Sequence, residues 1–137
     1  MTKTALLIAF LFGCSSSTDD TGDWSAPTEM LTDGERWWVS WTSSPQPPPF
    51  NEVFSLTVEA TDPDTGSPAE GTSFALEILM PDHGHGMQVS PVISEVDAGK
   101  WLAEGAVLHM EGLWEIRVGL TDETGQEAAI FDLMCCD

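Results

Sequence analysis

The chain has 137 residues and carries 23 acidic side chains against four basic ones, which gives a formal charge of −19. So negative a surface is repelled by nucleic acid and by anionic membrane surfaces, and charge therefore excludes both as direct partners. Hydrophobic residues make up 42% of the chain and six residues are tryptophan, enough apolar material for one domain with a modest core but too little for two.

The first 13 residues have the organisation of a bacterial export signal. Lys3 supplies a positive charge, and the apolar run Ala5–Phe12 that follows is too short to span a bilayer as a helix. The run closes on Leu11-Phe12-Gly13-Cys14, which is similar to a lipobox, although the small residue usual before the glycine is here a phenylalanine. An ordinary signal peptide with a coincidental cysteine is the alternative. We predict a lipoprotein-type signal over 1–13 and lipidation of Cys14.

A polar tether follows the signal. Ser15–Asp23 contains no apolar residue, so it cannot pack against a core and is expected to be a flexible linker. The sequence therefore predicts a tether over residues 14–33, a folded domain over 34–134 and a short cysteine-containing tail over 135–137.

Apolar residues of the domain recur at every second position. In Val53–Ala60, the side chains of Phe54, Leu56 and Val58 share one face while polar residues occupy the other, which is typical of a half-buried strand. The same reasoning predicts strands at Arg36–Thr42, Val53–Ala60, Phe74–Met80, Trp101–Met110, Trp114–Leu120 and Ala128–Leu133. The fourth of these is expected to be interrupted near Gly105.

Turn-forming clusters separate these strands, at Pro45–Pro49, Asp62–Gly66, Asp97–Gly99 and Asp122–Gly125. No segment has the apolar spacing of an amphipathic helix longer than a turn or two. Short strands with regular turn punctuation predict an all-β fold, a single antiparallel immunoglobulin-like β-sandwich.

Histidine and methionine gather in one of the expected loops. Met80–Met87 contains two histidines and two methionines within eight residues, and the third histidine of the chain is followed directly by a methionine. Imidazole and thioether are neutral ligands that copper accepts, with thioether favouring Cu(I). The candidate copper ligands are His83, His85, Met87, His109 and Met110.

A structural explanation competes with the copper hypothesis. Proline, aspartate and glycine favour turns by backbone preference alone, so the loop is also explained as a surface turn. Met80 continues the inward face of its strand and is expected in the core. His83 and His85 would point the same way in an extended segment, whereas His109 and Met110 would face opposite sides, so only one of the latter two is expected to approach the loop.

Cys135 and Cys136 are adjacent at the C-terminus and cannot staple distant segments together. Two explanations stay open. The pair, with Met134, is a soft clamp for Cu(I), or it is a frayed tail whose thiols oxidise together or pair between molecules. Chain ends are seldom ordered, which favours the tail.

Two motifs resemble the YtkA-like family. They are Met80-Pro81-x-His83-Gly84-His85-Gly86 and, further on, Met110-x-Gly112-x-Trp114, and the likeness extends over about 50–120. The family consists of small exported immunoglobulin-like proteins, often lipid-anchored, that are associated with copper and respiratory-chain proteins. The resemblance implies copper handling at the histidine loop and a partner among envelope or respiratory-chain proteins. The cysteine pair lies outside the pattern.

Enzymatic motifs are missing from the sequence: there is no nucleophile elbow, no phosphate-binding glycine loop and no zinc-binding helix motif. We therefore expect a non-enzymatic envelope lipoprotein, held at the membrane by its lipid and facing the periplasm or the exterior, that binds or delivers copper. The alternative is a metal-free immunoglobulin-like interaction module tethered at the membrane surface.

Overall fold

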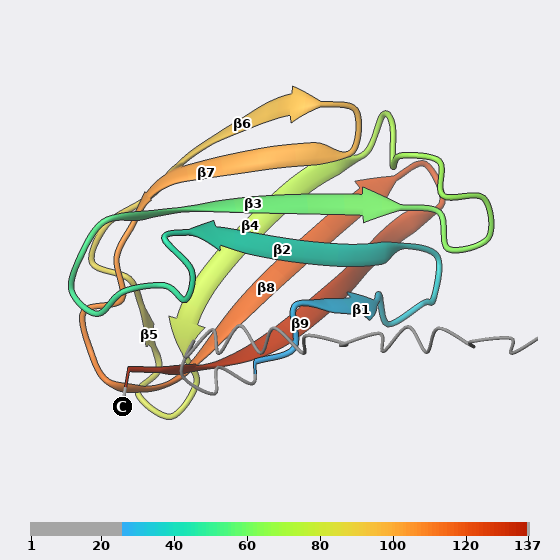
Figure 1. The fold of residues 1–137 in the computed structure, drawn as a ribbon. Coiled ribbons are helices and arrows are strands. Elements are labelled where there is room, and N and C mark those ends of the chain that lie inside the picture. The colour runs from blue at the N-terminus through green and yellow to red at the C-terminus, as the bar shows by residue number, and fades with distance from the viewer. Residues whose placement is uncertain (1–25, 137) are drawn as a thin grey trace, which may run out of the picture.

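The computed structural model describes residues 26–136 (Figure 1). The predicted signal peptide and Cys14 lie outside these residues. The described part contains nine strands and no helix, and therefore no helix long and apolar enough to cross a membrane. Two antiparallel sheets pack face to face, which confirms the predicted β-sandwich and is compatible with its immunoglobulin-like character.

The first sheet has five strands in the order β1-β2-β3-β7-β6. Its members are β1 (Glu29–Leu31), β2 (Trp38–Ser44), β3 (Phe54–Thr61), β7 (Lys100–Ala106) and β6 (Val92–Asp97). The second sheet has four strands in the order β5-β4-β8-β9. Its members are β5 (His85–Gly86), β4 (Ser73–Met80), β8 (Gly112–Asp122) and β9 (Gly125–Cys135).

The core lies between the sheets and is built by the alternation seen in the sequence. Every second residue of β3 and of β8 is buried, as in the run from Phe54 to Ala60. Aromatic rings join the two layers: Trp41 of β2 meets Phe131 of β9 edge to face, and Phe74 of β4 stacks on Trp101 of β7 with centroids 4.5 Å apart. Aromatic pairs prefer particular ring orientations, so they make the packing more specific in a core whose stability comes mainly from buried apolar surface.

The sheets extend further than predicted at both ends of the domain. β1 lies inside the predicted tether of residues 14–33, where its three residues pair with β2, and β9 includes Cys135, predicted as tail. Val92–Asp97, expected to be a connection, is the edge strand β6. In the other direction, the strand predicted over Trp101–Met110 is shorter: β7 carries a bulge at Gly105 (φ 89°) and ends at Ala106.

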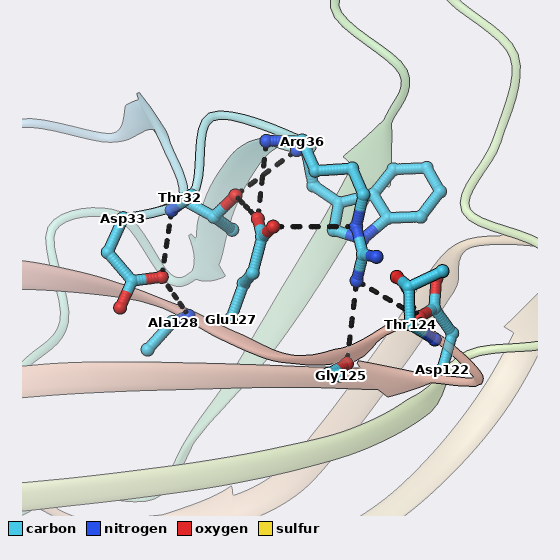
Figure 2. A network of polar contacts seen from close by, with 10 residues as sticks. Thr32, Asp33, Arg36, Asp122, Thr124, Gly125, Glu127 and Ala128 are labelled. Carbon is cyan, nitrogen blue, oxygen red and sulfur yellow. Dashed lines mark hydrogen bonds and ion pairs between the residues drawn. The ribbon is translucent and has the colours of Figure 1, made fainter.

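A polar network ties the β1–β2 connection to the β8–β9 hairpin (Figure 2). Glu127 accepts a hydrogen bond from the hydroxyl of Thr32, a residue only 2% exposed, and pairs with the guanidinium of Arg36. Arg36 also contacts Asp122, with 3.1 Å between Nη2 and Oδ1, and the backbone N–H of Asp33 donates to a β9 carbonyl. The network fastens the N-terminal edge of the sandwich to its C-terminal hairpin.

Candidate functional site

Three segments meet at one end of the sandwich, at the lower left of Figure 1: the turn from β4 to β5, the connection from β7 to β8, and the end of β9. The strand pairing explains the meeting. His85 lies opposite Met80 across the β4–β5 pair, and Gly112, where β8 begins, lies opposite Cys135 of β9. The ring centroids of His85 and His109 are 5.5 Å apart, so the histidine loop and the chain around His109 lie at the same end.

The β4–β5 turn holds His83 and His85 in a tighter arrangement than predicted. The backbone N–H groups of His83 and Gly84 both donate to the carbonyl of Met80, at 3.2 and 3.0 Å, and Gly84 takes φ 66°. These hydrogen bonds fold the chain into a turn, as the competing turn explanation expects, so the two histidines are not spaced along an extended segment. The two rings are nevertheless neighbours, with centroids 5.7 Å apart and planes 50° apart.

His109 lies beyond β7, in the connection to β8, and is fixed from both sides. The preceding residue, Leu108, is fully buried and its carbonyl accepts a hydrogen bond from the N–H of Asn51 at 2.8 Å. On the other side, the indole Nε1–H of Trp114 donates to the carbonyl of Met110 at 2.9 Å. The ring of Trp114 also meets the imidazole of His109 edge to face, with centroids 5.5 Å apart.

All three imidazoles of the chain gather at this end. His85 is central, with its ring 5.5 Å from that of His109 and nearly parallel to it (30°), and 5.7 Å from that of His83. His83 and His85 are exposed at the rim, whereas His109 is half-buried. The three rings therefore form a row from the rim towards the core.

Two ring nitrogens distinguish this row from three unrelated surface histidines. The Nδ1 of His85 lies 3.0 Å from the carbonyl oxygen of Gly86. In the neutral tautomer that donates from Nδ1 to this carbonyl, Nε2 keeps a lone pair for a ligand. A backbone carbonyl on the second nitrogen is the usual arrangement for a metal-binding histidine. The Nδ1 of His109 is buried and has no hydrogen-bond partner. A buried nitrogen without a partner is destabilising, and a ligand that contacts it removes that penalty.

The methionines of the site are more deeply packed than the sequence indicates. Met80 is 1% exposed and belongs to the core, as predicted. Met87 and Met110 are half-buried and pack against the core, although no core partner for Met87 was evident in the sequence. Both thioethers therefore have a structural role beside any role as ligands.

The side chains are not closed around an ion-sized space. Within residues 26–136, no group of three or more His, Cys, Asp and Glu side chains is arranged to hold a metal ion. A shared ion therefore requires the exposed rings of His83 and His85 to rotate towards His109. Such rotations of exposed side chains are fast and need no change of backbone.

Trp114 also contributes to this site, which the alternation of its strand does not indicate. Alternation along Trp114–Leu120 places the residue on the inward face, and it is fully buried, but it also positions His109 and the carbonyl of Met110. The spacing Met110-x-Gly112-x-Trp114 was the available signal, since it brings the indole back to the chain four residues earlier.

Cys135 and Cys136 form a disulfide between adjacent residues. The bond joins no distant segments, as the sequence predicts. Cys135 is 2% exposed and ends β9, and Cys136 is half-buried and packs against the core. Cys135 is therefore not part of a frayed tail, because its pairing with Gly112 holds it in the sheet, whereas the expected oxidation of the two thiols together is what the structure shows.

No family of known proteins matches this chain, and neither does any curated protein or solved structure.

Proposed function

We propose that this protein is a copper-binding lipoprotein of the bacterial envelope, built on a YtkA-like domain, that holds or delivers copper at the histidine end of its sandwich. The observation that carries the proposal is the convergence of His83, His85 and His109, the only histidines of the chain, from two connections far apart in sequence. Chance does not readily bring every imidazole of a protein to one place.

The chemistry of the surrounding donors favours copper over zinc. Imidazole suits Cu(I) and Cu(II), and thioether sulfur favours Cu(I). Met87 and Met110 lie at this end, half-buried, whereas zinc is normally bound by cysteine, histidine or carboxylate. The free Nε2 of His85 and the unpartnered Nδ1 of His109 are the nitrogen donors best prepared for an ion.

Delivery is the role that the exposure of the site supports. His83 and His85 lie at the rim, where a partner protein has access to a bound ion without any opening of the sandwich. The predicted lipid at Cys14 would keep the domain near the membrane, among envelope or respiratory-chain proteins that need copper. We propose binding and transfer, with no catalytic step.

The test is a competition titration of the purified protein with Cu(I) and Cu(II). Replacing both His85 and His109 by alanine removes the central ring and the buried donor, and we expect copper affinity to fall at least about tenfold, the equivalent of about 1.4 kcal/mol of binding free energy. Met87→Leu is expected to weaken Cu(I) binding more than Cu(II) binding.

Glu123→Gln is the matched control, because Glu123 is exposed in the turn between β8 and β9 at the opposite end of the sandwich. It removes one negative charge without touching the histidines. If this variant and the histidine variant bind copper with the same affinity as the unchanged protein, copper is attracted only diffusely by the acidic surface, and the proposal is wrong.

A metal-free interaction module is the second candidate function, and β6 supports it. This edge strand is exposed along its whole length, with Val92 70%, Ile93 41% and Val96 51% exposed. An edge strand with unpaired backbone groups accepts a further strand from another chain. The acidic surface favours a partner segment that alternates apolar and basic residues.

The two functions are separable by variants. Ser94→Pro in β6 removes a backbone N–H and is expected to abolish binding of such a strand-donating envelope protein, whereas the His83→Ala, His85→Ala double variant leaves it intact. Copper affinity should show the reverse dependence. If an envelope partner binds with equal strength to both variants, β6 is not its docking edge.

A further inference from the structure

Sulfur-bearing side chains gather at the same end as the histidines. Cys135 is buried opposite Gly112, and the methyl group of Met80 lies 3.2 Å from where a side-chain carbon on Gly112 would be. Met110 lies two residues before that glycine and packs against the same core. The C-terminal cysteine pair is therefore part of the end of the sandwich that holds the imidazole row.

Cys136 has a backbone conformation that non-glycine residues disfavour. Its φ is 81°, in the left-handed region. The covalent link to Cys135, with the two Cα atoms 3.5 Å apart, keeps its side chain turned towards its neighbour. When the link is broken, Cys136 is free to leave this conformation, and its thiol is free to turn towards another atom.

We propose that Cys135 and Cys136 form a redox-gated site for a thiophilic metal ion, Cu(I), in which the dithiol binds the ion and the disulfide does not. The inference deepens the proposed copper function and rests on it. It assigns the pair a second, softer site beside the imidazole row, consistent with the preference of Cu(I) for thiolate sulfur.

The gating step is a thiol–disulfide exchange with an external dithiol. One thiolate of that dithiol attacks the sulfur of Cys136, the more exposed of the two, and the sulfur of Cys135 leaves as a thiolate and takes a proton. The second thiolate of the reductant then displaces Cys136, and the reductant is left as a disulfide. Two electrons pass to the protein, and binding of Cu(I) afterwards releases the two thiol protons.

The test compares Cu(I) affinity before and after reduction, by competition with a chromophoric Cu(I) chelator. The protein is oxidised with a diazene oxidant or reduced with a dithiol, and the reagent is removed before titration under nitrogen. We expect the reduced protein to bind Cu(I) at least about tenfold more tightly than the oxidised protein. We expect Cys136→Ser, which leaves the buried Cys135 in place, to bind Cu(I) equally after either treatment.

Met134→Leu is the matched control, because it removes the neighbouring sulfur from an exposed position and should keep the redox difference. In the oxidised protein only the histidine site is expected to bind Cu(I). Loss of Cu(I) binding by the oxidised protein would therefore contradict the proposed copper function and would not by itself test the cysteine pair. Equal Cu(I) affinity of the reduced and oxidised proteins would overturn the inference. A redox difference that persists in Cys136→Ser would overturn it as well.

Discussion

The position of His109 depends on residues that are not themselves ligands. The carbonyl of Leu108, the residue before His109, accepts a hydrogen bond from Asn51. The ring of Trp114 contacts the imidazole of His109, and its Nε1–H donates to the carbonyl of Met110. Because Trp114 is fully buried, the imidazole rests against a surface that cannot move without disturbing the core. Because the ring of His109 is already held in place, a metal ion has to order only the rings of His83 and His85, and the entropic cost of binding is smaller.

Trp114→Phe tests this positioning. The substitution keeps an aromatic ring but removes the Nε1–H that donates to Met110, and we expect it to lower the free energy of unfolding by about 1–2 kcal/mol and to weaken copper binding several-fold. Urea unfolding and copper titration measure the two effects. Trp101→Phe is the control, since Trp101 is equally buried but stacks on Phe74. It should lose stability and keep its copper affinity, and an equal loss of affinity would contradict the role of Trp114.

Gly99 shows how strictly one residue is constrained. Its φ is 65°, and an added side-chain carbon would lie 2.7 Å from the carbonyl oxygen of Ala60 and 2.7 Å from the backbone nitrogen of Ala69. We expect Gly99→Ala to destabilise the protein by roughly 3 kcal/mol or more, from the left-handed backbone and the collision together. Gly66→Ala, with φ 72° and no atom within 4 Å, should cost only about 1–2 kcal/mol. If both variants have the same free energy of unfolding, the backbone around Gly99 moves aside and the close contacts do not add to the cost of the substitution.

At the scale of elements, alternation predicts the strands that have one covered face. β3, β4 and β8 were predicted within one or two residues of their limits, because a buried and a solvent face leave a clear pattern of two. β6 was missed because it is exposed along its whole length and shows no such pattern, and β1 and β5 because two or three residues are too few for one.

The candidate site, like the strands, could be predicted only where a local sequence pattern carries the information. Residue type and spacing identified the imidazoles and thioethers. Pairing of neighbouring strands does not account for the meeting of His85 with His109, because β4 and β7 belong to different sheets. The turn that folds His83 back, the buried Nδ1 of His109 and the ordered cysteine pair depend on contacts between segments far apart in sequence. No local pattern encodes such contacts.

The ion pair between Arg36 and Asp122, which links the β1–β2 connection to the β8–β9 hairpin, should make the stability of the protein depend on pH. Hydrogen bonds from the hydroxyl and the N–H of Thr124, followed by the charge of Arg36, lower the pKa of Asp122 below its usual value of 3.8. A lowered pKa means stability that is present above pH 3.8 and lost as pH falls through the folded-state value. Asp122→Asn should therefore melt at a lower temperature than the unchanged protein at pH 7, and the difference should shrink below about pH 3.8. Glu123→Gln should show no such pH-dependent gap, and a gap that is constant down to pH 2 would refute the assignment.

At the scale of the whole molecule, charge surrounds the candidate site without defining it. The three basic residues of the described chain are paired with carboxylates, Arg36 with Asp122 and Glu127, Lys100 with Glu59 and Arg117 with Glu115. Most of the 23 acidic residues therefore remain uncompensated and attract any cation diffusely. A specific copper site must be distinguished from this background by the histidines that it engages.

The most direct measurement is a nitrogen-15 NMR titration of the histidine side chains with Cu(I), with Ca²⁺ as the control for diffuse attraction. The chain has three histidines, so all six ring nitrogens are resolvable. We predict that the ring signals of His85 and His109 shift together and stop changing at one equivalent of Cu(I), with His83 following, while Ca²⁺ leaves them unchanged. Imidazole signals that do not move at one equivalent of Cu(I), or that move equally with Ca²⁺, would contradict a copper site at this end of the sandwich.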